Sequence, residues 1–363
     1  MMGSPRGSPP DNDAMILSTA PLGTPWPTID PFLFCVHHDD RYPRGNGRYG
    51  PAAPLDGRQM GSDFSRRDGW SMYHGLEVPG FPAHPHRGFE TVTIVRRGRI
   101  DHADSLGAMA RYGDGDVQWL TAGRGIVHAE MFPLLHTAQD NPLDLFQIWL
   151  NLPGRSKMCK PYFSMLWTHE VPRAVQANPD GGRVELTMIS GRLPGLEAAA
   201  FAAVTPGPTL VPPAPPPDSW ASAPDSDVAI CTLRLEGAAG FELPAAAGRQ
   251  TRRVLYFHAG AGLNLAGREI RDLAAIEVDA TQPLEIRHAA GASAAELLML
   301  QGRPIGEPVA QYGPFVMNTE QQIREAFSDY QRTRFGGWPW PGEAPVHGPD
   351  PTRVARQPGQ NLV

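Results

Sequence analysis

AHPHRGFETVTIV (residues 83–95) and TAGRGIVHAEMF (residues 121–132) are the two stretches that decide the fold of this chain of 363 residues. Each combines β-branched and aromatic residues, which favour strands, with a short polar triplet. The triplets are HPH, which begins at His84, and HAE, which begins at His128. Alternate residues of a strand point to the same face of a sheet, about 6–7 Å apart along the backbone, so the outer residues of each triplet can share a face.

The outer residues of the two triplets are His84, His86, His128 and Glu130. If the two strands lie opposite each other, three imidazoles and one carboxylate converge on one point. Three nitrogens and one hard oxygen suit a divalent first-row transition metal with open coordination positions, at which a substrate or dioxygen can bind. The alternative is two surface histidines and an unrelated HxE, because short motifs recur by chance and Pro85 cannot donate to a sheet ladder.

The rest of the sequence predicts an all-β protein. Glycine and proline number 39 each, and turn-forming residues at this density interrupt helices. Short runs of β-branched and aromatic residues recur between the turns, which favours a β-sandwich or barrel. These runs are residues 90–95, 116–120, 145–152, 183–189, 228–235, 252–257, 274–278 and 295–300. One helix is predicted near the end, where Thr319 and Gln322 form a capping-box pattern before an apolar stripe.

Composition restricts the class of protein. The formal net charge of −6 argues against general nucleic-acid binding, which needs a basic surface. The sequence contains no uninterrupted apolar run long enough to cross a bilayer, and the N-terminus lacks the apolar core of a secretory signal. Three cysteines without a close pair fit a reducing compartment. We therefore expect a cytoplasmic protein with no membrane partner and no direct nucleic-acid partner.

The order and spacing of several motifs resemble the pirin family of the cupin superfamily. The pattern HxHxxxE, a glycine-rich turn and GxxH runs from His84 through Glu90 to Gly125 and His128. The segments that carry the likeness are HPHRGFETVTIV, DHADSLG, GDGDVQWLTAGRGIVHAEM, LFQIWLNLP, RPIGEPVAQYGPFVMNT and FGGWPW. Because these segments extend over nearly the whole chain, it is identified as a member of this family.

The resemblance implies a bicupin, in which two tandem double-stranded β-helix (jelly-roll) barrels are followed by a C-terminal helix. Only the first barrel of a pirin holds a metal, and the second half of this chain contains neither HxH nor HxE. The expected organisation is a disordered leader (1–29), a metal-binding N-terminal cupin (30–165), a metal-free C-terminal cupin (166–318) with a Pro-rich loop (205–227), and a helix with an extended tail (319–363).

The resemblance also implies a ligand set. The four ligands of the family fall on His84, His86, His128 and Glu130, and the metal is usually ferrous iron, Fe(II). In many cupins the residue at the place of Glu90 is itself a ligand. In pirins Glu130 takes that duty, so we expect Glu90 to accept a hydrogen bond next to the ligands. The alternative is a satisfied residue at the rim of the site.

Two functions are open at this point, because some pirins act as quercetin 2,3-dioxygenases and others are partners of transcription factors or metabolic enzymes. As an oxygenase, the protein would bind a flavonol such as quercetin, and Glu130 would be the catalytic base for the 3-hydroxyl proton. As a binding protein, it would use the oxidation state of the metal to switch the surface met by an unidentified protein partner. A purely structural metal fits less well, because structural sites are usually closed and rich in cysteine.

Overall fold

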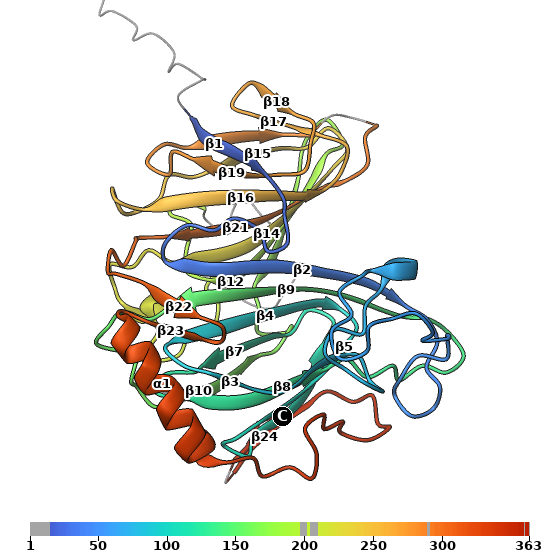
Figure 1. The fold of residues 1–363 in the computed structure, drawn as a ribbon. Helices are drawn as coiled ribbons and strands as arrows, with labels where there is room; N and C mark the ends of the chain where they lie inside the picture. Colours follow the sequence, from blue (N-terminus) through green and yellow to red (C-terminus); the bar gives the residue numbers. More distant parts are fainter. Residues whose placement is uncertain (1–14, 197–201, 204–209, 289–290, 359, 363) are drawn as a thin grey trace, which may run out of the picture. The chain divides into compact units, whose positions relative to one another are not determined.

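The computed structural model describes residues 15–196, 202–203, 210–288, 291–358 and 360–362. The chain divides into two compact units, each built mainly from antiparallel β-strands (Figure 1). We call them the histidine unit and the apolar unit, after the residues that distinguish their cores. The histidine unit comprises Asp30–Glu170, Ala214–Ala223 and Ile305–Val363, and the apolar unit comprises Met1–Ile29, Val171–Pro213 and Pro224–Pro304.

The histidine unit contains two main sheets. One has the strand order β10-β7-β4-β9-β2, and the other has the order β25-β24-β6-β5-β8-β3. The strands are β2 (Phe32–Tyr42), β3 (Gly80–His86), β4 (Phe89–Arg97), β5 (Arg99–Asp104), β6 (Met109–Gly113), β7 (Val117–Thr121), β8 (Ile126–Met131), β9 (Asn141–Asn151), β10 (Tyr162–Leu166), β24 (Val354–Gln357) and β25 (Gln360–Leu362). A hairpin of β22 (Ala310–Tyr312) and β23 (Phe315–Met317) precedes the helix α1 (Glu320–Thr333).

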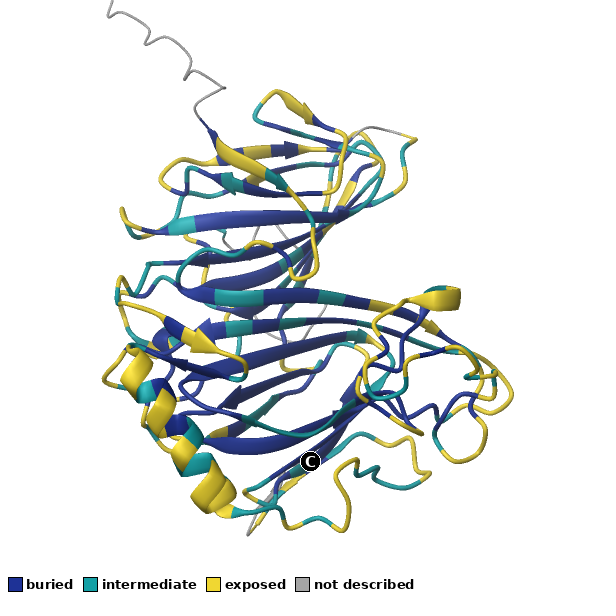
Figure 2. Ribbon diagram, viewed as in Figure 1, coloured by how far each residue is buried: buried dark blue, intermediate teal, exposed yellow. Residues whose placement is uncertain are grey.

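The central strand β4 illustrates why these residues form sheets. Its sequence, FETVTIVRR, is rich in β-branched side chains, which pack well on a pleated surface. Strands β7 and β9 pair with it on its two edges, and its first seven residues are buried whichever face they point to. Strand β8, which carries the HAE triplet, is buried throughout, and β3, which carries the HPH triplet, is buried at its two ends and partly buried between them (Figure 2). Side chains of the triplets therefore point into a protein core.

The apolar unit has one large and one small sheet, with the orders β1-β19-β16-β21-β14-β12-β11-β13 and β15-β20-β17-β18. The strands are β1 (Ile16–Pro21), β11 (Arg173–Ala177), β12 (Arg183–Ser190), β13 (Ala202–Ala203), β14 (Ala229–Glu236), β15 (Gly240–Leu243), β16 (Arg252–Ala259), β17 (Leu263–Leu265), β18 (Arg268–Ile270), β19 (Ala274–Val278), β20 (Leu284–Arg287) and β21 (Ala295–Gly302). Alternate residues of these strands, such as Leu255 and Phe257 on β16, form one hydrophobic core.

The structure confirms the predicted all-β class. Each of the eight runs marked in the sequence overlaps a strand. The predicted helix is present as α1, and Thr319 and Gln322 form its capping box. Its buried residues Ile323 and Ala326 face the hairpin of β22 and β23, while most of its other residues are exposed (Figure 2). Among the described residues, no helix is both long and apolar enough to cross a membrane.

Two expected boundaries differ from the structure. The disordered leader was expected to reach residue 29, but Ile16–Pro21 forms β1 and pairs with β19. Ile16 is buried in the core of the apolar unit, and this burial provides the stabilisation that a polar leader would lack. Residues 1–14 lie outside the described residues. The second difference concerns residues 305–318, expected in the second barrel, which belong to the histidine unit through β22 and β23.

The described part of the Pro-rich stretch 205–227 is also divided between the two units. Residues 204–209 lie outside the described residues, and Ala214–Ala223 belongs to the histidine unit. This second part contains the short 3-10 helix η4 (Trp220–Ser222), which Ser219 caps through its side chain. Trp220 is buried, so this part of the stretch is packed against protein rather than solvated.

Candidate metal centre

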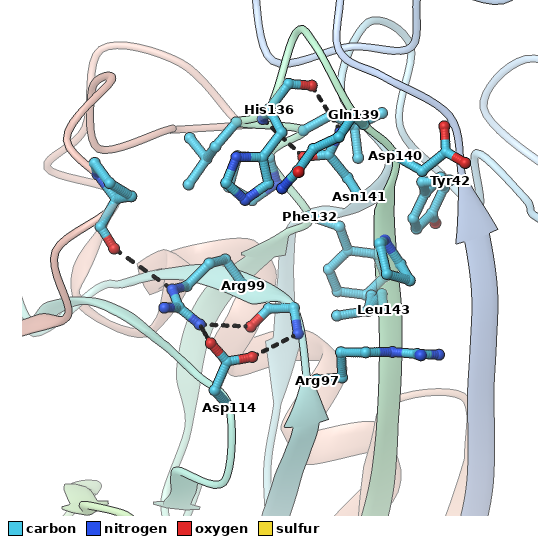
Figure 3. Close-up of a pocket in the computed structure, with 16 residues that line it drawn as sticks. Tyr42, Arg97, Arg99, Asp114, Phe132, His136, Gln139, Asp140, Asn141 and Leu143 are labelled. Atoms are coloured by element: carbon cyan, nitrogen blue, oxygen red, sulfur yellow. Dashed lines mark hydrogen bonds and ion pairs between the residues drawn. The ribbon is translucent and has the colours of Figure 1, made fainter.

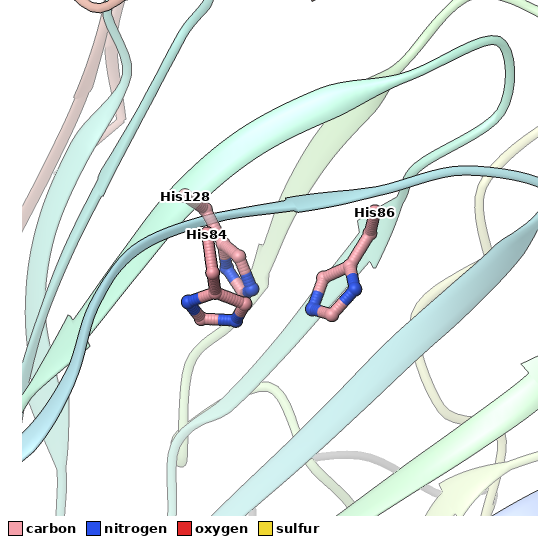
Figure 4. A group of neighbouring side chains, drawn as sticks. All are labelled: His84, His86 and His128. Atoms are coloured by element: carbon pink, nitrogen blue, oxygen red, sulfur yellow. The ribbon is translucent and has the colours of Figure 1, made fainter. Parts of the chain in front are cut away.

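The two polar triplets lie side by side on neighbouring strands. Strands β3 and β8 pair in antiparallel register, and His84 stands directly opposite His128. Because His86 is two residues from His84, all three imidazoles point to the same side. Their ligand atoms, one ring nitrogen each, lie within 4.8 Å of one another (Figure 4). Strand β3 is the last in its sheet and has a bulge between Phe81 and His84, so Pro85 lies where a missing ladder donor is tolerated.

Backbone carbonyls orient two of the three imidazoles. Nδ1 of His84 lies 2.8 Å from the carbonyl oxygen of Pro82, and Nδ1 of His86 lies 3.4 Å from that of Pro314. A carbonyl oxygen can only accept, so Nδ1 carries the proton and donates it. Nε2 of each ring is then left with its lone pair, which is the form in which histidine binds a metal.

His128 has the least satisfied ring of the three. It is fully buried, and neither ring nitrogen has a hydrogen-bond partner among the described residues. Its ring centroid lies 4.5 Å from that of His84 and 4.9 Å from that of His86. An unpaired buried polar group costs about 1–3 kcal/mol, and a cation shared by the three rings would remove that cost. The donor set therefore fits a metal ion.

Burial keeps the three imidazoles neutral. Removal from water lowers the pKa of His84 to about 4, and it lowers the pKa values of His86 and His128 well below the ordinary value. Neighbouring histidines lower these pKa values further, because two adjacent cations would repel each other. At neutral pH the three side chains are therefore unprotonated, as a metal ligand must be.

Glu130 lies next to this cluster and is held by two hydrogen bonds. Its Oε1 accepts from Oγ1 of Thr93 at 3.2 Å, and its Oε2 accepts from Nε2 of Gln147 at 2.6 Å. Oε2 also lies 4.0 Å from Nε2 of His128. Burial raises the pKa of Glu130, while His102, Gln147 and Thr93 oppose that rise. The structure thus brings all four residues of the predicted set together, with the carboxylate at the side of the imidazole cluster.

Comparison with known proteins places the chain in a family. Residues 25–150 match the family model described as Pirin, and residues 230–336 match the Pirin C-terminal cupin domain. Together these matches cover more than half of the chain. The chain belongs to the pirin family. The expected membership is thereby confirmed.

Several relatives resemble this pirin over most of its length. A Pseudomonas aeruginosa protein named "Putative quercetin 2,3-dioxygenase" is 34% identical over 257 residues, which are 70% of this chain and 79% of the relative. A pirin-like protein of Caulobacter vibrioides is 32% identical over 334 residues, or 91% of this chain and 96% of the relative. Human pirin is 31% identical over 278 residues, or 73% of this chain and 80% of the relative.

Solved structures confirm the bicupin fold of this pirin. The crystal structure of a quercetin 2,3-dioxygenase from Acinetobacter baumannii is similar with a TM-score of 0.61. The match covers 89% of this chain and 96% of the other, at 23% sequence identity. A second structure of a quercetin 2,3-dioxygenase from the same organism matches 91% of this chain and 90% of the other, with a TM-score of 0.60 and 20% identity.

A further buried histidine of this pirin, His102 on β5, lies beside the cluster and was missed in the sequence. Its ring lies 5.6 Å from that of His128. Its Nε2 lies 3.1 Å from Oδ2 of Asp104, and its Nδ1 lies 3.0 Å from Nε2 of Gln118. Strand β5 pairs with β8 so that His102 is opposite Glu130 and Asp104 is opposite His128. The triplet HAD has the same alternation as HPH and HAE, and that signal could have placed it beside the site.

The expectation that Glu90 accepts a hydrogen bond next to the ligands is wrong. Glu90 is fully buried and accepts hydrogen bonds from Oγ1 of Thr121 at 2.7 Å and from Oγ of Ser219 at 2.5 Å. Thr93, three residues further along β4, points to Glu130. Residues an odd number of positions apart point to opposite faces of a strand, so Glu90 points away from the histidines. Burial raises the pKa of Glu90 to about 7.

The segment after α1 lies along the strands of the site. The backbone N–H of Ala83 donates to the carbonyl oxygen of Glu343 at 2.7 Å, next to His84. Nε1 of Trp340 donates to the carbonyl oxygen of Asp104 at 2.8 Å. This segment therefore covers the outer edge of β3 and the end of β5, close to the imidazole cluster.

Gly125 of the GxxH motif has a role in this arrangement. Its φ of +135° is a conformation that favours glycine, and a Cβ at this position would lie 2.6 Å from the ring of Phe335. Phe335 follows α1 in the chain, so the motif glycine lets the C-terminal part of the chain approach the loop before β8.

A cavity of about 250 Å³ lies elsewhere in the histidine unit (Figure 3). Its wall combines the aromatic ring of Phe132 with the polar side chains of Arg97, Arg99 and His136. None of the three clustered histidines lines it. Arg99 is already paired with Asp114, so the polar side of this cavity is partly neutralised.

Proposed function

We propose that this pirin holds one divalent transition metal on His84, His86, His128 and Glu130, with ferrous iron as the ion. The observation that carries the proposal is the cluster of three neutral imidazoles, two buried and one partly buried, of which one lacks any hydrogen-bond partner among the described residues. Imidazole nitrogens with one carboxylate suit a non-haem ferrous centre with open positions. Such a site differs from a structural zinc site, which is closed and rich in cysteine.

The activity that we infer is the oxidative cleavage of a flavonol, as in a quercetin 2,3-dioxygenase. It is supported by the donor set and by the name of the Pseudomonas aeruginosa relative. A bound ferrous ion would supply a Lewis acid for the oxygen atoms of a flavonol and electrons for dioxygen. The proposed substrate is therefore a small molecule. The formal net charge of −6 does not favour a nucleic acid as partner.

The residues of the chain have separate tasks in this proposal. Glu130 is the base that takes the 3-hydroxyl proton of the flavonol, since its carboxylate lies next to the imidazole cluster. Burial raises the pKa of Glu130, so the carboxylate is a stronger base than an exposed one. Gln147 and Thr93 hold the two carboxylate oxygens in place. The three histidines would hold the ion through one ring nitrogen each.

Oxygen consumption tests this function directly. Protein loaded with ferrous iron without oxygen is mixed with quercetin in aerated buffer, and oxygen uptake and iron content are both measured. We expect uptake by the wild type and by His136→Ala, whose side chain is exposed outside the cluster, and none by His86→Ala. Wild-type protein that contains iron but consumes no oxygen would contradict the dioxygenase proposal.

The second candidate is a metal-dependent binding protein. It is favoured by the segment after α1, because the contact between Ala83 and Glu343 covers the strand edge beside His84 and narrows the approach for a large substrate. In this case the metal would set the conformation of a surface that an unidentified protein partner recognises. Affinity capture with wild type and with His128→Ala tests it, and identical captured proteins would contradict it.

A further inference from the structure

The core of the apolar unit contains a buried cation, Arg253 at the start of β16. Alternate residues of this strand, Leu255 and Phe257, belong to the hydrophobic core, so Arg253 points to the same side. Its neighbour in the register of β21 is Gln301, and residues of β21 on that face are also in the core. Arg253 is 0% exposed to solvent.

The hydrogen bonds of this guanidinium group are incomplete. Nε and Nη2 of Arg253 both donate to Oε1 of Gln301, at 2.8 and 2.5 Å. Nη1 has no hydrogen-bond partner among the described residues. The amide of Gln301 is itself fixed, because its Nε2 donates to the carbonyl oxygen of Asp227 at 3.2 Å. The acceptor that the guanidinium does have is therefore a neutral amide oxygen.

The ionisable groups nearby do not neutralise the charge by contact. The carboxylate of Asp227 accepts from the backbone N–H of Gly248 at 2.9 Å and from Oγ1 of Thr251 at 2.6 Å through its Oδ2. Burial raises the pKa of Cys231 to about 12, so its thiol is neutral at physiological pH. Burial lowers the pKa of Arg253 itself only to about 10, which leaves it protonated.

A buried charge without a bonded counter-charge is one of the most unfavourable arrangements in a protein core. A water molecule could accept a hydrogen bond from Nη1, but it would bring no negative charge to the guanidinium group. An anion would do both. A carboxylate is well suited, because its two oxygens match the spacing of guanidinium N–H groups.

We propose that the apolar unit binds one small carboxylate against Nη1 of Arg253. The ligand has to be compact, because Arg253 is fully enclosed and its neighbours on the same face are apolar core residues. The positive charge of Arg253 calls for an anion, whereas the imidazoles of the histidine unit suit a cation. The site does not depend on the metal centre or on the proposed dioxygenase activity.

Hydrogen exchange of the full chain tests the proposal, with formate as the probe. Exchange of backbone amides is measured by mass spectrometry in formate and in a bulky sulfonate buffer at the same ionic strength. At a formate concentration about ten times the dissociation constant, we expect amides of β16 and β21 to exchange about tenfold more slowly. Peptides from the histidine unit should exchange equally fast in both buffers.

Two arginine variants separate this site from the rest of the surface. Arg253→Met should lose the effect of formate. Arg252→Met is the matched control and should keep it, because Arg252 is the next residue of the strand, points to the other face and pairs with Glu277. Equal exchange rates of the wild type in the two buffers would overturn the proposal. They would mean that a water molecule, not an anion, accepts from Nη1 of Arg253. An effect that persists in Arg253→Met would show an adventitious ion only.

A second measurement covers the case in which Arg253→Met does not fold. The line width of ¹³C-labelled formate in nuclear magnetic resonance reports binding to the wild type alone. We expect broadening that unlabelled acetate reverses and that the bulky sulfonate does not. A line width that is independent of the protein concentration would overturn the proposal.

Discussion

The cores of the two barrels are built from similar strands but hold different side chains. Strand β8 of the histidine unit places His128 and Glu130 in its core, whereas β21 of the apolar unit places Leu297 and Met299 there. All four residues are almost completely buried. Burial alone therefore does not distinguish a functional position from a structural one. The difference between these two strands lies in what the buried side chains require: both ring nitrogens of His128 lack a hydrogen-bond partner among the described residues, whereas Leu297 and Met299 carry no group that needs one.

This difference indicates what each barrel contributes. An apolar core stabilises the fold through the area that it removes from water, about 25 cal/mol per Å². A core with unpaired imidazoles gives up part of that stabilisation, and local departures of this kind are typical of functional sites. If this interpretation is correct, substitutions in the two cores should affect different measurements.

The largest effect is expected from His128→Ala. Its ring is the central member of the cluster, close to both other imidazoles. Loss of a residue that only supports a ligand already weakens metal binding 10–100-fold, so loss of a ligand should weaken it by more than about 100-fold. Metal content after dialysis against a weak chelator measures this, with His136→Ala as the exposed control. A His128→Ala protein that retains one metal ion per chain would contradict the ligand assignment.

In the apolar unit the matching substitution should change stability and leave the metal in place. Leu255→Ala removes a fully buried side chain, and such changes cost about 2–5 kcal/mol of the free energy of unfolding. Leu273→Ala is the control in the same unit, because Leu273 is 43% exposed. Denaturant unfolding and metal titration are measured on the same samples. Weaker metal binding by folded Leu255→Ala would show that the two cores are not independent.

The sequence predicted the parts of the site that depend on alternation along a strand. His84, His86, His128 and Glu130 were found because residues two apart share a face, and the helix α1 was found from its capping pattern. Glu90 was misassigned although the same rule applies, because its role was taken from a motif spacing, and only the structure shows that Thr93, three residues further on, faces Glu130.

Other features depend on contacts between distant residues. Ser219, which bonds Glu90, is 129 residues away in the sequence, and Glu343 reaches Ala83 from the far end of the chain. The strand β1 was overlooked because its sequence, ILSTAP, follows a segment rich in proline, glycine and serine, and β19, with which it pairs, begins more than 250 residues later. No local pattern records such pairings, because the burial that stabilises them exists only in the folded chain.

The pH dependence of the free energy of unfolding provides a test of the histidine core. The pKa of His84 is lowered to about 4 from an ordinary value near 6.5. Between these two values the unfolded chain binds a proton at this side chain and the folded chain does not. Stability is then complete above pH 6.5 and falls as the pH drops towards 4, by roughly 2 kcal/mol when partial solvent access is allowed for. His86 and His128 act in the same direction.

Metal-free protein in a chelating buffer is the sample for this measurement, because a bound ion would compete with protons. The free energy of unfolding is followed from pH 7 to pH 4 for the wild type, His84→Gln and the exposed control His136→Gln. We expect the slope to decrease in His84→Gln and to stay unchanged in His136→Gln. Equal slopes in all three proteins would mean that the imidazole cluster is not protonated on unfolding.

The smallest effect is expected from the two residues that hold Glu130. The bond from Gln147 is 2.6 Å long and the bond from Thr93 is 3.2 Å long, so Gln147 should contribute more. A hydrogen bond to a charged group contributes about 1.5–3 kcal/mol, and we expect the turnover rate with quercetin to fall at least about tenfold in Gln147→Leu. Thr93→Val should cause a smaller loss. Both variants should retain the metal, because neither residue belongs to the imidazole cluster.

The pH profile of these variants separates a positioning role from a loss of packing. Gln147 and Thr93 both lower the pKa of Glu130 by donating to its charged form. Removing either donor should therefore raise the pKa of Glu130 and move the acidic limb of the rate profile to higher pH, further in Gln147→Leu than in Thr93→Val. Slower turnover with an unshifted acidic limb would mean that these side chains pack against Glu130 without setting its charge. A larger shift in Thr93→Val would mean that the two distances do not rank the two bonds.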